Sequence, residues 1–224
     1  AYCWGDGRAL GADLQPGEYP PRPVTVHLPG RAVSLSAEHG HTCALLDTGE
    51  LWCWGVSEAG ELGSGETPDD YLSPLGVAGD LAWAAVDAGP RLTCALTVDG
   101  AAYCWGDDAA GRLGTGADID AGATPQPVAG GHTFTAISAG ATHACAVDTE
   151  GVAWCWGENE TGALGVPYDA GGRCDGVACV PEPVAVDTDL RFTAIGAGAG
   201  YSCGITTAGT LVCWGKRDLM GIGR

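Results

Sequence analysis

The stretch that decides the fold is residues 41–55, HTCALLDTGELWCWG, in which Cys43 and Cys53 stand ten residues apart with Gly49 between them. The pattern returns in LTCALTVDGAAYCWG at 92–106, HACAVDTEGVAWCWG at 143–157 and YSCGITTAGTLVCWG at 201–215. The chain is therefore built from a repeated unit.

The CWG triplet that ends each stretch gives the length of this unit. The triplet begins at Cys3, Cys53, Cys104, Cys155 and Cys213, so successive copies lie 50, 51, 51 and 58 residues apart. A period near 50 residues fits a unit of four short strands, the size of one propeller blade. The expected organisation is one repeat domain over 1–224, with repeats at approximately 1–52, 53–103, 104–154 and 155–212 and a partial repeat at 213–224.

Each complete repeat contains four strand-like pieces that are rich in small and β-branched residues. In the first repeat these are PVTV, AVSLSA, HTCALL and ELWCWG, and the corresponding units start at Pro23, Pro74, Pro127 and Pro183. No apolar period of 3.6 residues persists for ten residues, so helix should be scarce. The sequence predicts an all-β repeat fold of four full four-stranded units, each the size of a propeller blade, with one extra strand, AYCWG, at the N-terminus.

The glycine between the cysteines predicts a hairpin. Gly49 would be the third residue of a three-residue loop, where a type I turn is followed by a left-handed residue, and Gly100, Gly151 and Gly209 repeat this position. Such a loop places the two cysteines opposite each other at a separation that suits a disulfide. The predicted pairs are Cys43–Cys53, Cys94–Cys104, Cys145–Cys155 and Cys203–Cys213; the alternative is that these cysteines are small buried thiols.

Three cysteines lie outside the hairpins. Cys174 and Cys179 fall in the connector that lengthens the last period, and they predict a fifth disulfide closing a local loop, or half of a zinc site with no visible second half. Cys3 is left free. A partner at the repeat spacing would precede residue 1, so we expect the chain to be a piece of a longer protein.

Composition restricts the classes of partner. The chain carries 28 acidic and 10 basic residues, for a formal net charge of −18. Such a surface repels phosphate backbones and anionic membranes, which argues against nucleic-acid binding, and no apolar run is long enough to insert into a membrane. Eleven cysteines favour an oxidising location that is extracellular, at the cell surface or periplasmic.

The stretches CWGVSEAGELGSG at 53, CWGDDAAGRLGTG at 104 and CWGENETGALG at 155 resemble the repeats of the regulator-of-chromosome-condensation family over essentially the whole chain. The resemblance implies a β-propeller, commonly of seven blades, in which the tryptophans and the Leu-Gly element pack between neighbouring blades. On this basis the chain is expected to be a fragment of a larger ring. Cysteine content and acidity favour a secreted, bacterial-type branch of the family.

The sequence contains no established catalytic or phosphate-binding motif. His41 and His143 recur in only two of the four hairpins and are interpreted as structural hydrogen-bonding groups within a blade. The acidic connectors could hold calcium, although no calcium-binding pattern is present, and no cofactor is expected. An enzymatic alternative is a polysaccharide hydrolase or lyase with carboxylates near the connector that holds Tyr168, Asp169 and Asp175.

The favoured function is a non-enzymatic module that binds a protein partner through connector loops on a rigid, disulfide-stabilised propeller. The candidate partner-binding residues are Tyr71, Trp83, Tyr168 and Asp169. A purely structural role, as a surface or adhesin spacer, is the other alternative.

Overall fold

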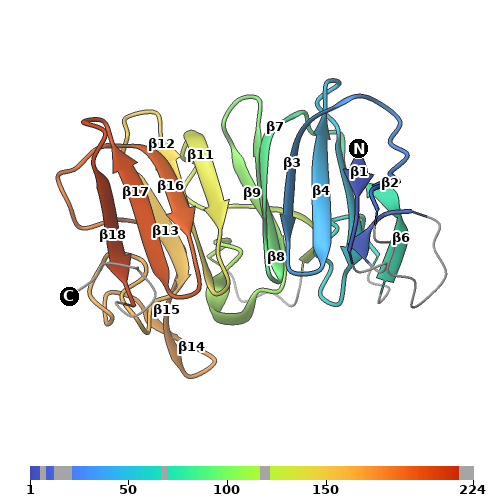
Figure 1. Cartoon of the computed structure of the whole chain (residues 1–224). Coiled ribbons are helices and arrows are strands. Elements are labelled where there is room, and N and C mark those ends of the chain that lie inside the picture. The colour runs from blue at the N-terminus through green and yellow to red at the C-terminus, as the bar shows by residue number, and fades with distance from the viewer. Residues whose placement is uncertain (6–8, 13–21, 67–69, 117–121, 217–224) are drawn as a thin grey trace.

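The computed structural model describes residues 1–5, 9–12, 22–66, 70–116 and 122–216. Strands dominate the described residues, and the one described helix is the three-residue 3-10 helix η2 (Ala109–Gly111). The strands form separate antiparallel sheets that stand side by side in chain order, from β1 and β2 at the N-terminal end to β18 at the C-terminal end (Figure 1). The fold is all-β and its sheets are the blades of a β-propeller, as predicted.

Three sheets contain at least four strands each. The first comprises β3 (Ala32–Glu38), β4 (His41–Leu46), β5 (Leu51–Val56) and β6 (Asp70–Gly76). The second comprises β7 (Trp83–Gly89), β8 (Leu92–Thr97), β9 (Ala102–Gly106) and β10 (Gly122–Pro127). The third comprises β11 (Phe134–Ala139), β12 (His143–Asp148), β13 (Ala153–Glu158), β15 (Val177–Ala185) and, outermost, β14 (Gly172–Cys174).

Two smaller sheets stand at the ends of the chain. The C-terminal sheet consists of β16 (Phe192–Ala197), β17 (Tyr201–Thr206) and β18 (Leu211–Gly215). At the N-terminal end, β1 (Tyr2–Cys3) pairs with β2 (Val24–Thr25). These two strands correspond in sequence to the third and fourth strands of a complete sheet.

The blades are out of phase with the units expected from the sequence. The proline-bearing strand, expected to open each unit, instead pairs with the CWG strand before it as the fourth strand of that sheet: β6 with Pro74, β10 with Pro127 and β15 with Pro183. In the third sheet β14 adds to β15, but it pairs with 177–179 and leaves the stretch with Pro183 at the sheet edge. Proline has no N–H to donate, so an outer strand with an irregular register suits it. The register indeed shifts where β6 and β15 pair with their neighbours.

The hairpin prediction is confirmed in all four copies. In the first, Leu45 pairs with Leu51 and Cys43 with Cys53, the Leu46 amide bonds to the Glu50 carbonyl at 2.9 Å, and Gly49 has φ +84°. The equivalent glycines have φ between +79° and +84°. Side chains other than glycine rarely adopt this conformation, which explains the glycine at this offset.

The structure contains the five expected disulfide pairs. The four hairpin pairs have Cα–Cα separations of 4.0 to 4.1 Å, and Cys174–Cys179 has a separation of 5.8 Å. Cys3 is free and half-buried, and burial raises the pKa of its thiol.

Neighbouring blades pack through the tryptophan of CWG and the Leu-Gly element of the preceding blade, as the resemblance implied. Trp105 is fully buried, and its Nε1 donates to the Glu61 carbonyl oxygen at 2.8 Å. Gly63 lies so close to this indole that a Cβ added there would meet Trp105 Nε1 at 2.7 Å. Leu62, between the two, is also fully buried, so each blade closes over the next through this contact.

The first strands of successive blades, β3, β7, β11 and β16, lie next to one another. Polar side chains link them: Ser36 Oγ donates to Asp87 Oδ1 at 3.1 Å, and Ser138 Oγ donates to Asp87 Oδ2 at 3.0 Å. Some apolar side chains are exposed, such as Leu35 in β3 and Leu211 in β18.

Candidate functional site

The loops that can carry function gather at one end of the blades, which we call the connector face. It consists of the described parts of the loops between the first and second strands and of the connectors between the third and fourth strands of each sheet. Because neighbouring strands are antiparallel, both sets of loops emerge at the same end, which is the lower side in Figure 1. The tight hairpin turns that carry Gly49 and its equivalents emerge at the opposite end.

One element breaks the repeat symmetry of this face. The connector after β13 forms an extra hairpin, β14 with the start of β15, which projects below the blades in Figure 1. Its turn consists of Asp175 (φ +49°) and Gly176 (φ +88°), and the Cys174–Cys179 disulfide crosses the hairpin from the strand end beside the turn to its base. The hairpin is therefore both exposed and covalently constrained.

Two of the four predicted partner-binding residues lie beside this hairpin. Tyr168 is 68% exposed and Asp169 is also exposed, in the connector that leads into β14. Both are therefore available to a partner at the connector face.

The prediction for Trp83 is wrong, because its side chain is only 4% exposed. Trp83 packs edge-on against Tyr103 at a centroid distance of 5.7 Å, and its ring is tilted against that of Trp105 at 5.8 Å. The sequence held a signal that we missed. Phe134 and Phe192 stand, like Trp83, 22 residues before the tryptophan of the next CWG, so an aromatic residue at this position belongs to the blade core.

Tyr71 lies in β6, where its backbone pairs with Gly55. Its side chain lies outside the described part of the structure, so its role stays a prediction.

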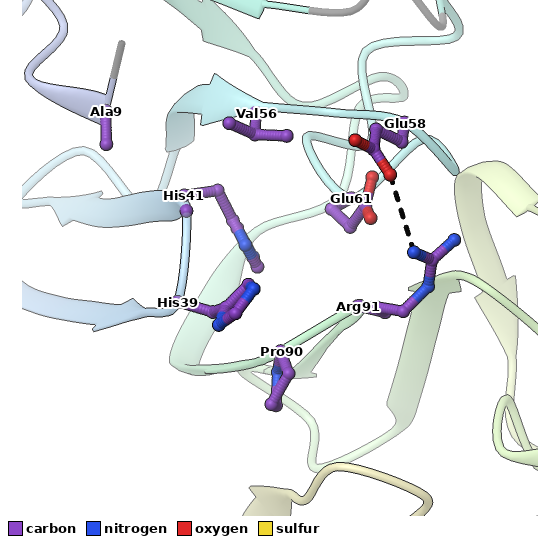
Figure 2. A pocket seen from close by; sticks show the side chains of 9 residues that line it. Ala9, His39, His41, Val56, Glu58, Glu61, Pro90 and Arg91 are labelled. Atoms are coloured by element: carbon purple, nitrogen blue, oxygen red, sulfur yellow. Dashed lines mark hydrogen bonds and ion pairs between the residues drawn. The ribbon is translucent and has the colours of Figure 1, made fainter. Parts of the chain in front are cut away.

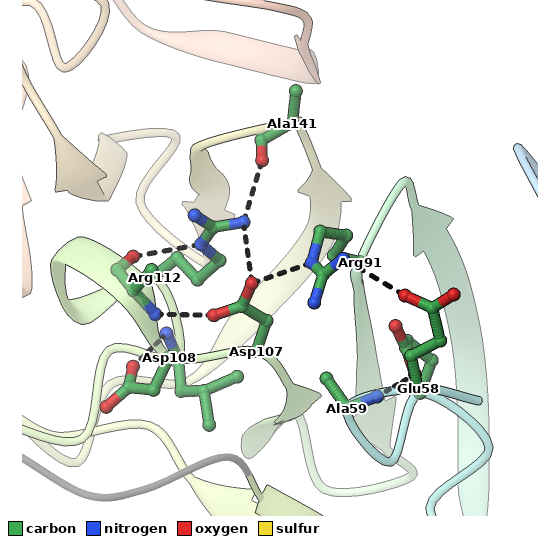
Figure 3. A network of polar contacts seen from close by, with 10 residues as sticks. Glu58, Ala59, Arg91, Asp107, Asp108, Arg112 and Ala141 are labelled. Carbon is green, nitrogen blue, oxygen red and sulfur yellow. Dashed lines mark hydrogen bonds and ion pairs between the residues drawn. The ribbon is translucent and has the colours of Figure 1, made fainter. Parts of the chain in front are cut away.

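A chain of charges runs across the connector face from the first complete blade to the second, and its last member, Arg112, donates to the Ala141 carbonyl oxygen of the third (Figure 3). Arg91 Nη1 lies 3.5 Å from Glu58 Oε2, and Arg91 Nε donates to Asp107 Oδ2 at 2.8 Å. Arg112 Nη1 lies 3.8 Å from the same Asp107 oxygen. Burial alone would raise the pKa of Asp107, but the Ala109 amide and the two arginines lower it overall.

The two recurring histidines connect blades, rather than bonding within one blade as we expected. His41 Nε2 lies 2.8 Å from Thr93 Oγ1 of the next blade, and the Thr93 hydroxyl donates to the Glu61 carbonyl oxygen at 2.8 Å. Because that hydroxyl proton is used, Nε2 must be the donor to Thr93. His143, Ser202 and the Ala163 carbonyl repeat the arrangement two interfaces further on.

Burial dominates the titration of both histidines. It lowers the pKa of His143 to about 4, and burial together with the neighbouring His39 lowers the pKa of His41 to about 4. At neutral pH both rings are uncharged and serve as hydrogen-bond donors between blades. A proton-transfer role would require a reacting group beside them, and their Nε2 atoms are already bonded to structural hydroxyls.

A cavity of about 330 Å³ opens on the connector face between the first and second complete blades (Figure 2). Its polar lining comes from His39, His41, Glu58, Glu61 and Arg91. Burial raises the pKa of Glu61, although the amides of Glu61 itself and of Ala59, and the charge of Arg91, partly oppose this effect. The cavity is small but lies in the size range of ligand sites.

The described residues contain no group of three or more His, Cys, Asp or Glu side chains placed to hold a metal ion. Nor does the described part of the chain include a helix long and apolar enough to cross a membrane.

Comparison with known proteins identifies the family of repeats that this chain matches. A family model described as "Regulator of chromosome condensation (RCC1) repeat" matches residues 99–147 and 150–205. A second model of the same description matches residues 33–61, 83–112 and 134–163.

Two curated proteins illustrate the sequence relationship. The ultraviolet-B receptor UVR8 of Arabidopsis thaliana is 33% identical over 193 residues, which cover 84% of this chain and 42% of the receptor. The human E3 ubiquitin-protein ligase HERC2 is 33% identical over 177 residues, which cover 73% of this chain and 4% of the ligase. The chain thus spans less than half the length of these relatives.

The crystal structure of Kap60 bound to yeast RCC1 (Prp20) shares the fold. It superposes with a TM-score of 0.82 at 22% identity, over 96% of this chain and 51% of the other.

Proposed function

The chain belongs to the regulator of chromosome condensation (RCC1) repeat family, and from this premise we propose that it is a non-enzymatic module that presents its connector face to a protein partner. The observation that carries the proposal is the β14–β15 hairpin, a disulfide-closed element found on one blade, with Tyr168 and Asp169 exposed beside it. Loops held on a rigid repeat scaffold are the usual recognition elements of such proteins. An exposed tyrosine supplies both apolar contact area and a polar group for binding.

The relatives support a binding role. Yeast RCC1 (Prp20), half of which superposes on this chain, was crystallised bound to another protein, Kap60. The match to HERC2 covers only 4% of that ligase, so its name transfers no activity to this chain. The charge of −18 favours a partner with a basic contact surface and disfavours nucleic acid.

Five disulfide pairs in 224 residues favour an oxidising location. We place the module outside the cytoplasm, as a secreted, surface or periplasmic member of the family.

Site-specific photocrosslinking tests the proposal. A benzophenone amino acid replaces Tyr168 on the connector face or, as the control, Val98 on the opposite face; the two native side chains are similarly exposed, at 68% and 70%. Each protein is irradiated in the extracytoplasmic fraction of the source cell. We expect a discrete crosslinked protein from position 168 that is absent from position 98. Equal crosslinking from both positions, or none from position 168, would refute the assignment of this face.

A further inference from the structure

The cavity between the first and second complete blades ends on a buried carboxylate. Glu61 is only 4% exposed, and its Oε2 accepts the Ala59 amide at 2.8 Å. The amide of Glu61 itself lies close enough to the carboxylate to lower its pKa, and the described residues supply no other hydrogen bond to the second oxygen, Oε1. Figure 2 shows the Glu61 carboxylate facing the open space toward Arg91. Such a group lacks part of the hydrogen bonding that a buried charge requires.

A second acceptor lines the same cavity. His41 is 3% exposed and donates through Nε2 to Thr93, so Nδ1 of the neutral ring carries a lone pair. Within the described part of the chain, no donor bonds to Nδ1. Two largely buried side chains therefore line the cavity with acceptor atoms, Glu61 Oε1 and His41 Nδ1, to which no described side chain donates.

The next interface shows how the chain fills this space elsewhere. Arg112 stands 51 positions after Glu61, at the equivalent place before the Leu-Gly element, and is only 8% exposed. It donates through Nε to the Ala109 carbonyl oxygen at 2.9 Å and through Nη1 to the Ala141 carbonyl oxygen at 3.0 Å. Leu92 takes the place of His41 there. One interface thus carries its own cation, whereas the other carries an anion and an open cavity.

We propose that this cavity binds a lysine side chain of the protein partner, with the ammonium group donating to Glu61 Oε1 and His41 Nδ1. The inference rests on the proposed function, because it identifies one anchor of the same connector face. A lysine fits better than an arginine, since Glu61 Oε2 is already occupied and a bidentate guanidinium pair would need both oxygens. The positive charge of Arg91 does not exclude a second cation, because that charge is paired with Asp107 at 2.8 Å and with Glu58 at 3.5 Å.

Backbone amide NMR tests the cavity without knowledge of the partner. The probe is a short blocked peptide with one lysine between glycines, titrated at 0.15 M salt, and the control probe carries Nε-acetyllysine instead. We expect saturable shifts at Gly40, Ala59 and Glu61 with the lysine peptide and none with the acetylated peptide. Glu61→Gln should weaken binding about tenfold or more, as expected for loss of a charged hydrogen bond. Glu150→Gln, an exposed change on the opposite face, should leave it unchanged.

A second variant keeps the test decisive. Glu61→Arg should supply the missing cation from within the chain, as Arg112 does in the next interface, and abolish peptide binding. The dispersion of the amide spectrum shows whether each variant folds. If Glu61→Gln does not fold, the test is the comparison of lysine and acetyllysine peptides on the unmodified protein. Equal binding of both peptides, or shifts spread over all acidic loops and insensitive to Glu61→Gln, would overturn the proposal. Crosslinking from position 168 does not depend on this cavity, so failure here leaves the proposed function standing.

Discussion

The buried histidine–hydroxyl pairs predict that acid weakens the blade interfaces, and the chain contains its own control. His143 pairs with Ser202 of the next blade, whereas Leu92 and Ala144 occupy the equivalent positions one interface earlier. The double variant His143→Leu/Ser202→Ala therefore copies a pair that this fold already uses. It removes one titrating group and keeps the interface filled.

The sign and size of the effect follow from burial. The folded pKa of His143 is about 4 against an ordinary 6.5, so the unfolded chain takes up a proton first as pH falls. Stability contributed by the neutral ring is present above pH 6.5 and is lost as pH falls through 4. The full difference between the folded and unfolded pKa values corresponds to about 3.4 kcal/mol of unfolding free energy. At pH 5.0, where the folded ring is still mostly neutral, about 2 kcal/mol of this has been lost.

Urea unfolding with the disulfides intact, at pH 7.5 and 5.0, measures this term. The unmodified protein should lose about 2 kcal/mol more than the double variant over that interval. The carboxyl groups titrate in both proteins, so the difference isolates the histidine. If both proteins lose the same free energy, burial of His143 does not set the pH dependence, and the reasoning fails.

Two further predictions concern packing and covalent structure. Gly63→Ala should lower the free energy of unfolding by about 1 to 3 kcal/mol, because a Cβ there meets the Trp105 indole, whereas Gly79→Ala, also at positive φ but in open space, should lower it less. Urea unfolding of the two variants separates the effect of the indole contact from that of backbone strain. Intact mass after alkylation without reduction should show a single labelled cysteine, mapped to Cys3 by peptide analysis, and labelling of most cysteines would contradict the disulfide pairs and the oxidising location.

Local chemistry made much of this structure readable from the sequence. The cysteine separation of ten residues, with the glycine one place past the midpoint, requires a three-residue loop and fixes the register of four hairpins. The period near 50 residues and the absence of helical periodicity indicated repeated four-stranded units, and the resemblance to a known repeat family identified them as propeller blades. These features depend on residues close together in the chain, so their geometry follows from backbone sterics and turn chemistry.

Contacts between units were decided only by the tertiary structure. Proline-bearing strands close the preceding sheet because the CWG strand offers them a pairing edge, and Trp83 is buried because a neighbouring tyrosine and tryptophan enclose it. The Glu61 cavity likewise exists because blades about 50 residues apart in sequence bring His41, Glu61 and Arg91 together. The sequence by itself determined the blade and its hairpin, since short-range sterics specify both. The stacking of blades determined which side chains are buried and which face a cavity. The reason is that the burial of a side chain depends on neighbours from other blades, and these neighbours are not connected to it by any local sequence pattern.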